Sequence, residues 1–337
     1  MSTIQESSEL LFLYETSYNI PNGDPFTGEQ RYDEETKKIL VSDVRIKRFV
    51  RSYLQEIGEE IFVDNKEGND AKSVLESKIK KSELSDTVDV GAVMRQMIDV
   101  RLFGGISTLK NDGEVEEETK LEDGTTHKTK KKYKNGHIQF TGPVQFSLLN
   151  PSLNRVNMRM HQNTSHFSSD KDKSQGTIGT TTVVPYSVMQ IHGWVNPSVA
   201  KTTGMTKDDK QKLCKGLWYG TSGNGSSFSR SKIGQDSLLL LEIVYKEPHT
   251  KIYGVDRLIK ITPKDSKKEE ELRSMDDYDF DFSKLIEALA DDKVVKVRYY
   301  TEIKGIEKSL MKIKIKDGQQ VKEEDSKIAS KLEVLSL

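Results

Sequence analysis

The stretch 18–53, YNIPNGDPFTGEQRYDEETKKILVSDVRIKRFVRSY, joins a turn-rich loop to an amphipathic helix. In the loop, Asn22-Gly23 favours positive φ, and Pro21 and Pro25 interrupt regular structure on either side. A short extended piece is expected over 36–41. The stretch therefore predicts a loop, a short strand and a helix in succession.

The helix carries its cations in an unusual place. Ser42 is a good N-cap, and apolar residues recur beyond it at helical spacing, namely Ile46, Phe49, Val50, Tyr53, Leu54 and Ile57. Off this apolar stripe, near the helix start, lie Arg45, Lys47, Arg48 and Arg51. Cations at this end oppose the helix macrodipole. An anion bound near the helix N–H groups would explain the cluster, although a solvated charged face explains any one of these residues.

The composition narrows the class of protein. With 52 Lys+Arg and 53 Asp+Glu, the 337-residue chain has a net charge of -1, so a nucleic-acid site must be a local patch. The single cysteine, Cys214, excludes an intramolecular disulfide framework and is interpreted as a buried apolar residue. No apolar run reaches the length of a membrane span, and the N-terminus lacks the basic start of a signal peptide. We expect a cytoplasmic protein that does not bind membranes.

The rest of the chain alternates strand-like segments with charged excursions. Apolar or alternating runs predict strands at 9–16, 137–149, 183–195, 237–246, 252–261, 293–301 and 310–315. The segment 252–261 is expected to pair with 237–246, and Thr206 caps a second predicted helix over 206–218. We expect 106–136 to be a mobile charged insertion. The order of elements predicts an α+β domain of split βαβ type.

Catalytic and metal-binding patterns are weak in this sequence. The six His residues lack the spacing of a zinc site, and no GxSxG elbow is present, so we predict no cofactor and no metal. Asp24 and Asp33 beside Arg31 form a candidate acid–cation site, but an Asx turn explains Asp24 equally well. The Gly- and Ser-rich run 220–234 lacks P-loop spacing, yet such a loop can approach phosphate. It contains three candidate ligands, Ser229, Arg230 and Lys232.

Ordered motifs between residues 10 and 250 are similar to those of a known family. The first stretch holds NIPNGDP at 19–25, then Arg31, Asp33 and Thr36, then VSDVRIKR at 41–48. Later blocks follow in the expected order: DVRLFGG at 99–105, TGPVQFS at 141–147, VPYSVMQIHGWVN at 184–196 and SRSKIGQ at 229–235. Each block alone is weakly specific. Together they resemble the backbone, CRISPR RNA (crRNA)-binding subunit of the type I CRISPR surveillance complex Cascade, a RAMP-superfamily protein, and are closest to subtype I-B.

The resemblance implies a hand-shaped α+β protein. An RRM- or ferredoxin-like palm would comprise 1–57, 138–153 and 184–337. A helical fingers insertion would occupy 58–137, and an extended thumb hairpin or loop would occupy 154–183. The part from Asp265 onward matches less clearly.

The resemblance also implies a non-catalytic function and a set of partners. Several copies would polymerise helically along one CRISPR RNA, hold its phosphates, and present its bases for pairing with a target DNA strand in antiviral defence. The other expected partners are the large, small, guide-processing and 5'-end-capping subunits of the complex.

A protein that accepts any guide sequence is expected to hold phosphates and leave base edges free. The candidate RNA-binding residues are Asn22, Gly23, Ser42, Arg45, Lys47, Arg48, Arg51, Gln139, Ser229, Arg230 and Lys232. Met158 and Met160 are candidate thumb wedges for a flipped nucleotide, although contact with a neighbouring subunit or simple exposure explains them equally. No RNP1 aromatic motif is recognisable, so base stacking on the sheet is not predicted.

Two other functions remain open from the sequence. Related backbone subunits of type III complexes cleave target RNA with a loop aspartate, and Asp24 would be that residue in a magnesium-dependent endoribonuclease. A sequence-specific RNA-binding regulator is the third hypothesis. Its affinity would depend on base sequence, whereas the affinity of a scaffold would fall with salt and hardly depend on sequence.

Overall fold

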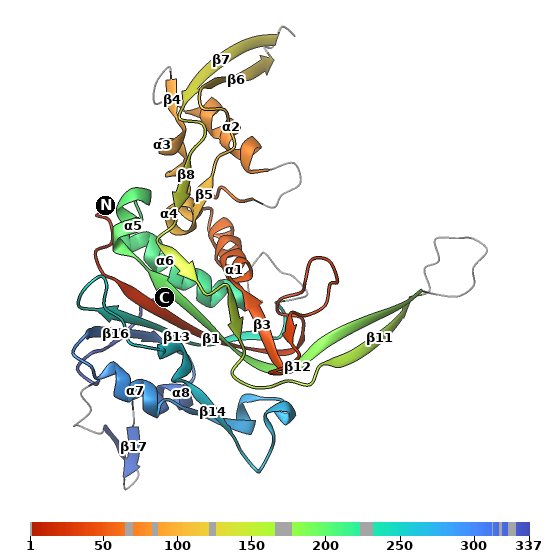
Figure 1. Cartoon of the computed structure of the whole chain (residues 1–337), viewed down its shortest axis with the longest axis vertical. Helices are drawn as coiled ribbons and strands as arrows, with labels where there is room; N and C mark the ends of the chain where they lie inside the picture. Colours follow the sequence, from red (N-terminus) through yellow and green to blue (C-terminus); the bar gives the residue numbers. More distant parts are fainter. Residues whose placement is uncertain are drawn as a thin grey trace.

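The computed structural model describes residues 2–64, 70–82, 87–120, 126–165, 177–222, 232–311, 313–316, 319–322 and 328–337. It is a mixed α+β structure in which a central sheet lies between two helical layers, and two extensions leave this body (Figure 1). The sheet has the order β11-β12-β1-β13-β16-β19, with β9 pairing with β12 off this path. None of the described helices is long and apolar enough to cross a membrane.

The middle of the sheet is β1 (Ser8–Asn19), which is antiparallel to both of its neighbours. These neighbours are β12 (Thr177–Val195) and β13 (Gln235–Tyr245). Beyond β13 follow β16 (Val294–Tyr300) and the parallel edge strand β19 (Leu332–Val334). The predicted strands at 9–16, 183–195, 237–246 and 293–301 are therefore confirmed.

The side chains of β1 alternate between two hydrophobic clusters. Leu10, Phe12 and Tyr14 lie in the cluster on one face of the sheet, whereas Leu11 and Leu13 lie in the cluster on the other. Because both faces are covered, the strand reads as a continuous apolar run and not as an apolar–polar alternation.

The first face of the sheet is covered by α1 (Asp43–Glu56) and α6 (Lys207–Thr221), with α5 (Pro197–Thr203) nearby. Ser42 and Thr206 cap the two longer helices, as predicted. The helices approach closely at Gly220, where a Cβ would lie 2.3 Å from a backbone oxygen of α1. This contact fixes α1 in place.

The second face is covered by α7 (Ser283–Leu289) and α8 (Lys304–Leu310). The prediction that 252–261 pairs with 237–246 is wrong, because β13 has β16 as its outer neighbour. Instead β14 (Lys260–Pro263) pairs with β15 (Tyr278–Asp281). The predicted strand at 310–315 is only partly correct, because Leu310 is still part of α8 and the strand that follows begins at Ile313. The remaining elements on this side are the 3-10 turns η1 (Val255–Arg257), η2 (Glu269–Glu271) and η3 (Met275–Asp277) and the hairpin of β17 (Ile313–Lys316) with β18 (Gln319–Lys322).

The first extension is built from residues of the segment 58–137 and has a hydrophobic cluster of its own, which includes Phe62, Leu75 and Met94. Its helices are α2 (Ala71–Lys81), α3 (Val90–Met94) and α4 (Ile98–Phe103). Its strands are β4 (Thr87–Asp89), β5 (Gly104–Ile106), β6 (Gly113–Lys120) and β7 (Thr126–Lys134), and β5 pairs with β8 (Gln139–Thr141).

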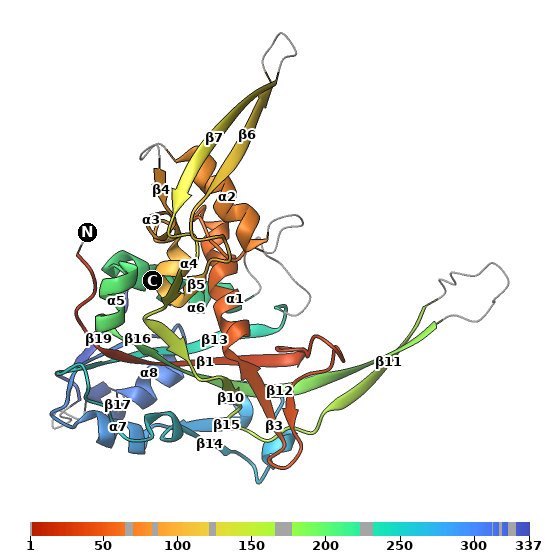
Figure 2. The same cartoon turned by 45° about the horizontal axis from the view of Figure 1, so that its top comes forward.

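The charged segment 106–136, which we expected to be a mobile insertion, contains two regular strands. Strands β6 and β7 form an antiparallel hairpin that stands away from the body, and the register places Glu114 opposite Lys132 and Glu116 opposite Lys130 (Figure 2). Opposite charges on facing residues stabilise such a pair. The acidic and basic runs are thus the two strands of one hairpin.

The second extension is a two-stranded arm. It consists of β11 (Arg159–Ser165) and the first part of β12, which pairs with β11 over 177–183 and with β1 from 184 onward (Figures 1 and 2). Near its base, β3 (Lys38–Ser42) lies between β2 (Tyr32–Asp33) and β10 (Leu149–Pro151), and β9 (Val144–Phe146) pairs with β12.

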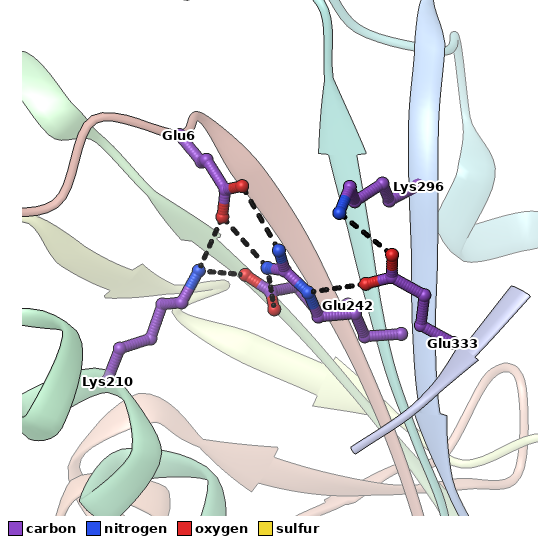
Figure 3. A network of polar contacts seen from close by, with 6 residues as sticks. Glu6, Lys210, Glu242, Lys296 and Glu333 are labelled. Carbon is purple, nitrogen blue, oxygen red and sulfur yellow. Dashed lines mark hydrogen bonds and ion pairs between the residues drawn. The ribbon is translucent and has the colours of Figure 1, made fainter. Parts of the chain in front are cut away.

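An ionic network fastens the N-terminal segment and α6 to the sheet (Figure 3). The Arg298 Nη1 group donates to Glu6 at 2.9 Å and to the fully buried Glu242 at 3.0 Å, and Lys210 donates to Glu242 at 2.6 Å. Hydrogen bonding from Arg298 lowers the pKa of Glu6 to about 2. Glu333 on β19 joins the network through Arg298 Nε at 3.4 Å and also pairs with Lys296 at 2.8 Å. The network balances its charges, so we interpret it as structural.

Candidate nucleic-acid interface

The loop before α1 is folded back onto the start of that helix. The Asn22 side-chain oxygen accepts from Ser42 N at 2.7 Å, and Asn22 N donates to Gln30 Oε1 at 2.8 Å. Gly23 forms a β-bridge with Gln30. Asn22 is buried, so it shapes the loop and does not face a ligand. Ser42 Oγ accepts from Arg45 N at 3.4 Å and is engaged as the helix cap.

Two of the four cations of α1 are paired with carboxylates. Lys47 Nζ lies 3.0 Å from Asp43 Oδ2, one turn earlier. Arg51 Nε lies 2.9 Å from Asp99 Oδ2 on α4. The Asp99 carboxylate is fully buried and also accepts from Phe62 N at 2.7 Å. Arg51 and Asp99 therefore tie α1 to the first extension.

The other two cations, Arg45 and Arg48, lie close enough to Lys232 for their charges to act on it, and Arg45 and Lys232 lie over the Phe49 ring. The Arg45 guanidinium carbon is 4.6 Å from the ring centroid, and Lys232 Nζ is 5.8 Å from it. Arg45 Nε donates to Pro21 O at 2.9 Å, which joins the cluster to the loop. Among the described residues, the buried Nη1 atom of Arg48 has no hydrogen-bond partner. We call Arg45, Arg48 and Lys232 the cation cluster.

The cation cluster is electrostatically unfavourable without a ligand. Burial lowers the pKa of Lys232 to about 8, and the charges of Arg45 and Arg48 contribute to the shift. Burial also lowers the pKa of Arg45 and of Arg48, and each is further disfavoured by a neighbouring arginine. A phosphate group would supply negative charge and an acceptor for the Nη1 atom of Arg48.

Asp24 is engaged within its own loop. Its Oδ1 atom accepts from Phe26 N at 2.9 Å and Thr27 N at 3.3 Å, and its Oδ2 atom lies 3.2 Å from Arg31 Nη2. The backbone hydrogen bond from Phe26 is the main cause of its lowered pKa. This is the Asx-turn geometry that the sequence left open. Within the part of the chain that the structure describes, no three His, Cys, Asp or Glu residues form a metal site.

The remaining residues predicted to contact RNA do not lie together at the cation cluster. Gln139 is exposed on β8, which pairs with β5 outside the central sheet. Met158 packs against the first hydrophobic cluster, whereas Met160 on the arm is 71% exposed and is the better placed of the two to meet a ligand. Ser229 and Arg230 lie outside the described residues.

Comparison with known proteins identifies the family. The family model described as CRISPR-associated protein Cas7 matches residues 6–283. The chain belongs to the Cas7 family. A relative from Haloferax volcanii, named CRISPR-associated protein Cas7, is 30% identical over 300 residues, which cover 86% of this chain and 84% of the relative.

Two solved structures are similar to this Cas7 family member at low sequence identity. A chain of a structure titled "CRISPR RNA-guided surveillance complex, pre-nicking" is 10% identical with a TM-score of 0.48, covering 88% of this chain and 93% of that one. A chain titled "CRISPR RNA-guided surveillance complex" is 12% identical with a TM-score of 0.46, covering 88% and 90%.

From the sequence of this Cas7 family member we predicted where the cations of α1 lie. We did not predict that Lys47 and Arg51 pair with carboxylates while Arg45 and Arg48 belong to the cation cluster. Phe49 was assigned only to the apolar stripe, yet its ring lies beneath Arg45 and Lys232. The one local signal is the i,i+4 spacing of Arg45 and Phe49, which places them on the same side of a helix. No local pattern indicates that Asp99 engages Arg51.

Proposed function

We propose that this chain is a non-catalytic backbone subunit that binds CRISPR RNA through its phosphates. Membership of the Cas7 family supports the assignment. The observation that carries the RNA site is the cation cluster: three buried or half-buried cations near the start of α1, two of which lie over the Phe49 ring. Such a site holds phosphate without reading bases, which is what a guide of arbitrary sequence requires.

We further propose an anatomy for this function. The central sheet with its helices serves as an RRM-like palm, the first extension as the fingers, and the β11–β12 arm as the thumb. Copies of the chain assemble helically along one RNA. The bases then face a target DNA strand, while the large, small, guide-processing and end-capping subunits of the complex complete the assembly.

The direct test is binding of the purified protein to single-stranded RNAs of equal length and unrelated sequence. We expect nearly equal affinities that fall steeply as salt rises, because each phosphate contact releases counterions. Arg45→Ala combined with Arg48→Ala should weaken binding to all sequences alike. A strong preference for one sequence would favour the regulator and contradict the proposal.

The ribonuclease alternative is tested on the assembled protein–RNA complex. We expect complementary RNA and Mg²⁺ to give no cleavage, because the Asp24 carboxylate is used by Phe26 N, Thr27 N and Arg31. Regularly spaced cuts that disappear in Asp24→Ala would overturn the non-catalytic assignment.

A further inference from the structure

Tyr18, at the end of β1, has a backbone conformation that bulky residues rarely adopt. Its φ is 44°, in the left-handed region, and its side chain is 66% exposed. The other described non-glycine residues with positive φ are Lys37, Asn135, Asp265 and Ser266. Tyr18 is thus the one aromatic residue among them. The strained conformation of Tyr18 needs an explanation, because an exposed ring gains too little burial energy to offset the cost of the strained backbone.

The strain is imposed by contacts on both sides of Tyr18. Ser17 N donates to Gly234 O at 2.8 Å, and the Asn19 side chain donates to Ile233 O at 2.6 Å. In the register of β1 with β12, Tyr18 stands opposite Pro185, which has no N–H to donate. The chain around Tyr18 is therefore fixed, and the ring is held outside the core.

These contacts place Tyr18 beside the cation cluster. The segment that anchors its two neighbours, Ile233–Gly234, follows Lys232 directly. Three residues after Tyr18, the Pro21 carbonyl accepts from Arg45. Before Val184, β12 pairs with β11 in the arm and no longer with β1 (Figure 2). Tyr18 precedes Asn19, the partner of Val184, so it stands where the arm leaves the sheet. Tyr18 is therefore tied, through its chain neighbours, to the segments that carry Lys232 and Arg45.

We infer that the Tyr18 ring is a stacking surface for one nucleobase of the RNA whose phosphates the cation cluster holds. The inference rests on the proposed function and adds a base-contacting residue to it. Stacking on an aromatic ring tolerates every base, so it is compatible with a guide of any sequence. A surface that combines cations and an exposed ring suits a polyanion with flat apolar groups better than it suits an apolar protein face.

The test uses substitutions that keep the backbone and change the ring. Tyr18→Asn removes the ring but tolerates positive φ, and Tyr18→Gly is a second such variant. Tyr18→Phe keeps the ring and is the matched control. Affinities of the full chain are measured for a single-stranded RNA and for an abasic ribose-phosphate oligomer of the same length. Both oligomers carry the same phosphates, so their difference isolates the bases.

We expect Tyr18→Asn and Tyr18→Gly to weaken binding to RNA about tenfold, within the range measured for one stacked base. Tyr18→Phe should bind RNA as the wild type does. Binding to the abasic oligomer should be unchanged by all three. Equal losses on both oligomers, or no loss on either, would overturn the inference, as would loss of self-association with RNA affinity unchanged.

Arg48→Ala separates this inference from the proposed function. If Arg48→Ala weakens binding to both oligomers while the Tyr18 variants change neither, the phosphate site stands and the stacking surface is wrong. If Arg48→Ala changes neither oligomer, the proposed site itself fails.

Discussion

Helix α1 carries two pairs of cations that look alike in sequence and differ in what surrounds them. Lys47 and Arg51 each contact a carboxylate, and Arg51 reaches the fully buried Asp99. Arg45 and Lys232 lie over the Phe49 ring with Arg48 nearby, and burial together with the charge of a neighbouring arginine lowers the pKa of each group. The first pair has carboxylate partners within α1 and α4 and helps to hold the fold together. The second group leaves the buried Nη1 atom of Arg48 without a hydrogen-bond partner among the described residues.

The largest effect that we expect from substituting one of these cations is a loss of folding stability in Arg51→Ala. Arg51→Ala leaves the Asp99 charge buried without its cation, which typically costs about 3–5 kcal/mol. Urea unfolding should show a loss of this size, with RNA affinity retained by the folded fraction. Arg51→Lys keeps the charge and should lose less. An unfolding curve like that of the wild type would mean that the pair does not fasten the first extension.

The next largest effect is on RNA binding. Arg48→Ala removes the group whose Nη1 atom lacks a partner among the described residues. A hydrogen bond to a charged group contributes roughly 1.5–3 kcal/mol, so we expect affinity for single-stranded RNA to fall about 10- to 100-fold. The unfolding midpoint should be unchanged or higher, because Arg48 is already disfavoured by burial. Fluorescence anisotropy with labelled RNA measures the change.

The pH dependence of binding tests the same cluster more finely. Lys232 has a pKa of about 8 in the free protein, and a nearby phosphate would raise it. Above pH 8 binding then takes up a proton, so RNA affinity should fall with rising pH, by at most about tenfold per pH unit. Lys232→Met should remove this dependence.

The same titration affects stability with the opposite sign. The pKa of Lys232 in the folded protein lies below its ordinary value of 10.5. Between pH 8 and 10.5 the unfolded chain therefore binds more protons than the folded one, and this residue makes stability of the free protein rise with pH. A wild-type stability profile identical to that of Lys232→Met in this window would contradict the assignment.

Local rules were enough to predict α1 but not the roles of its cations. Ser42, the apolar stripe and the positions of the cations follow from capping and from helical periodicity. The partners come from distant parts of the chain: Asp99 from α4 and Lys232 from the segment after α6. No pattern within one helix encodes such contacts, so the sequence assigned all four cations to one phosphate site.

The hairpin of β6 and β7 shows a second reason why the sequence prediction and the structure differ. Residues 106–136 contain few apolar residues and read as an irregular insertion. Val115 and Tyr133 are nevertheless buried, and the opposite charges of β6 and β7 face one another. Cross-strand pairing of this kind depends on register, which composition does not reveal.

The smallest expected effect is that of Lys47→Ala. It removes an i,i+4 pair with Asp43, and such pairs contribute about 0.2–0.5 kcal/mol to stability. RNA affinity should not change, although Lys47 is adjacent in sequence to Arg48. Chemical unfolding and RNA titration of this variant supply the matched control for the Arg48 variant.

The most direct test of the account is the salt dependence of RNA binding by wild type, Arg48→Ala and Lys47→Ala. The slope of log affinity against log salt concentration counts the phosphates that are neutralised, at about 0.7 per contact for single strands. We predict that the slope becomes shallower by roughly this amount in Arg48→Ala and keeps its wild-type value in Lys47→Ala. Equal slopes in all three proteins, or a change only in Lys47→Ala, would contradict the division of the cations of α1 into a structural pair and an RNA-binding cluster.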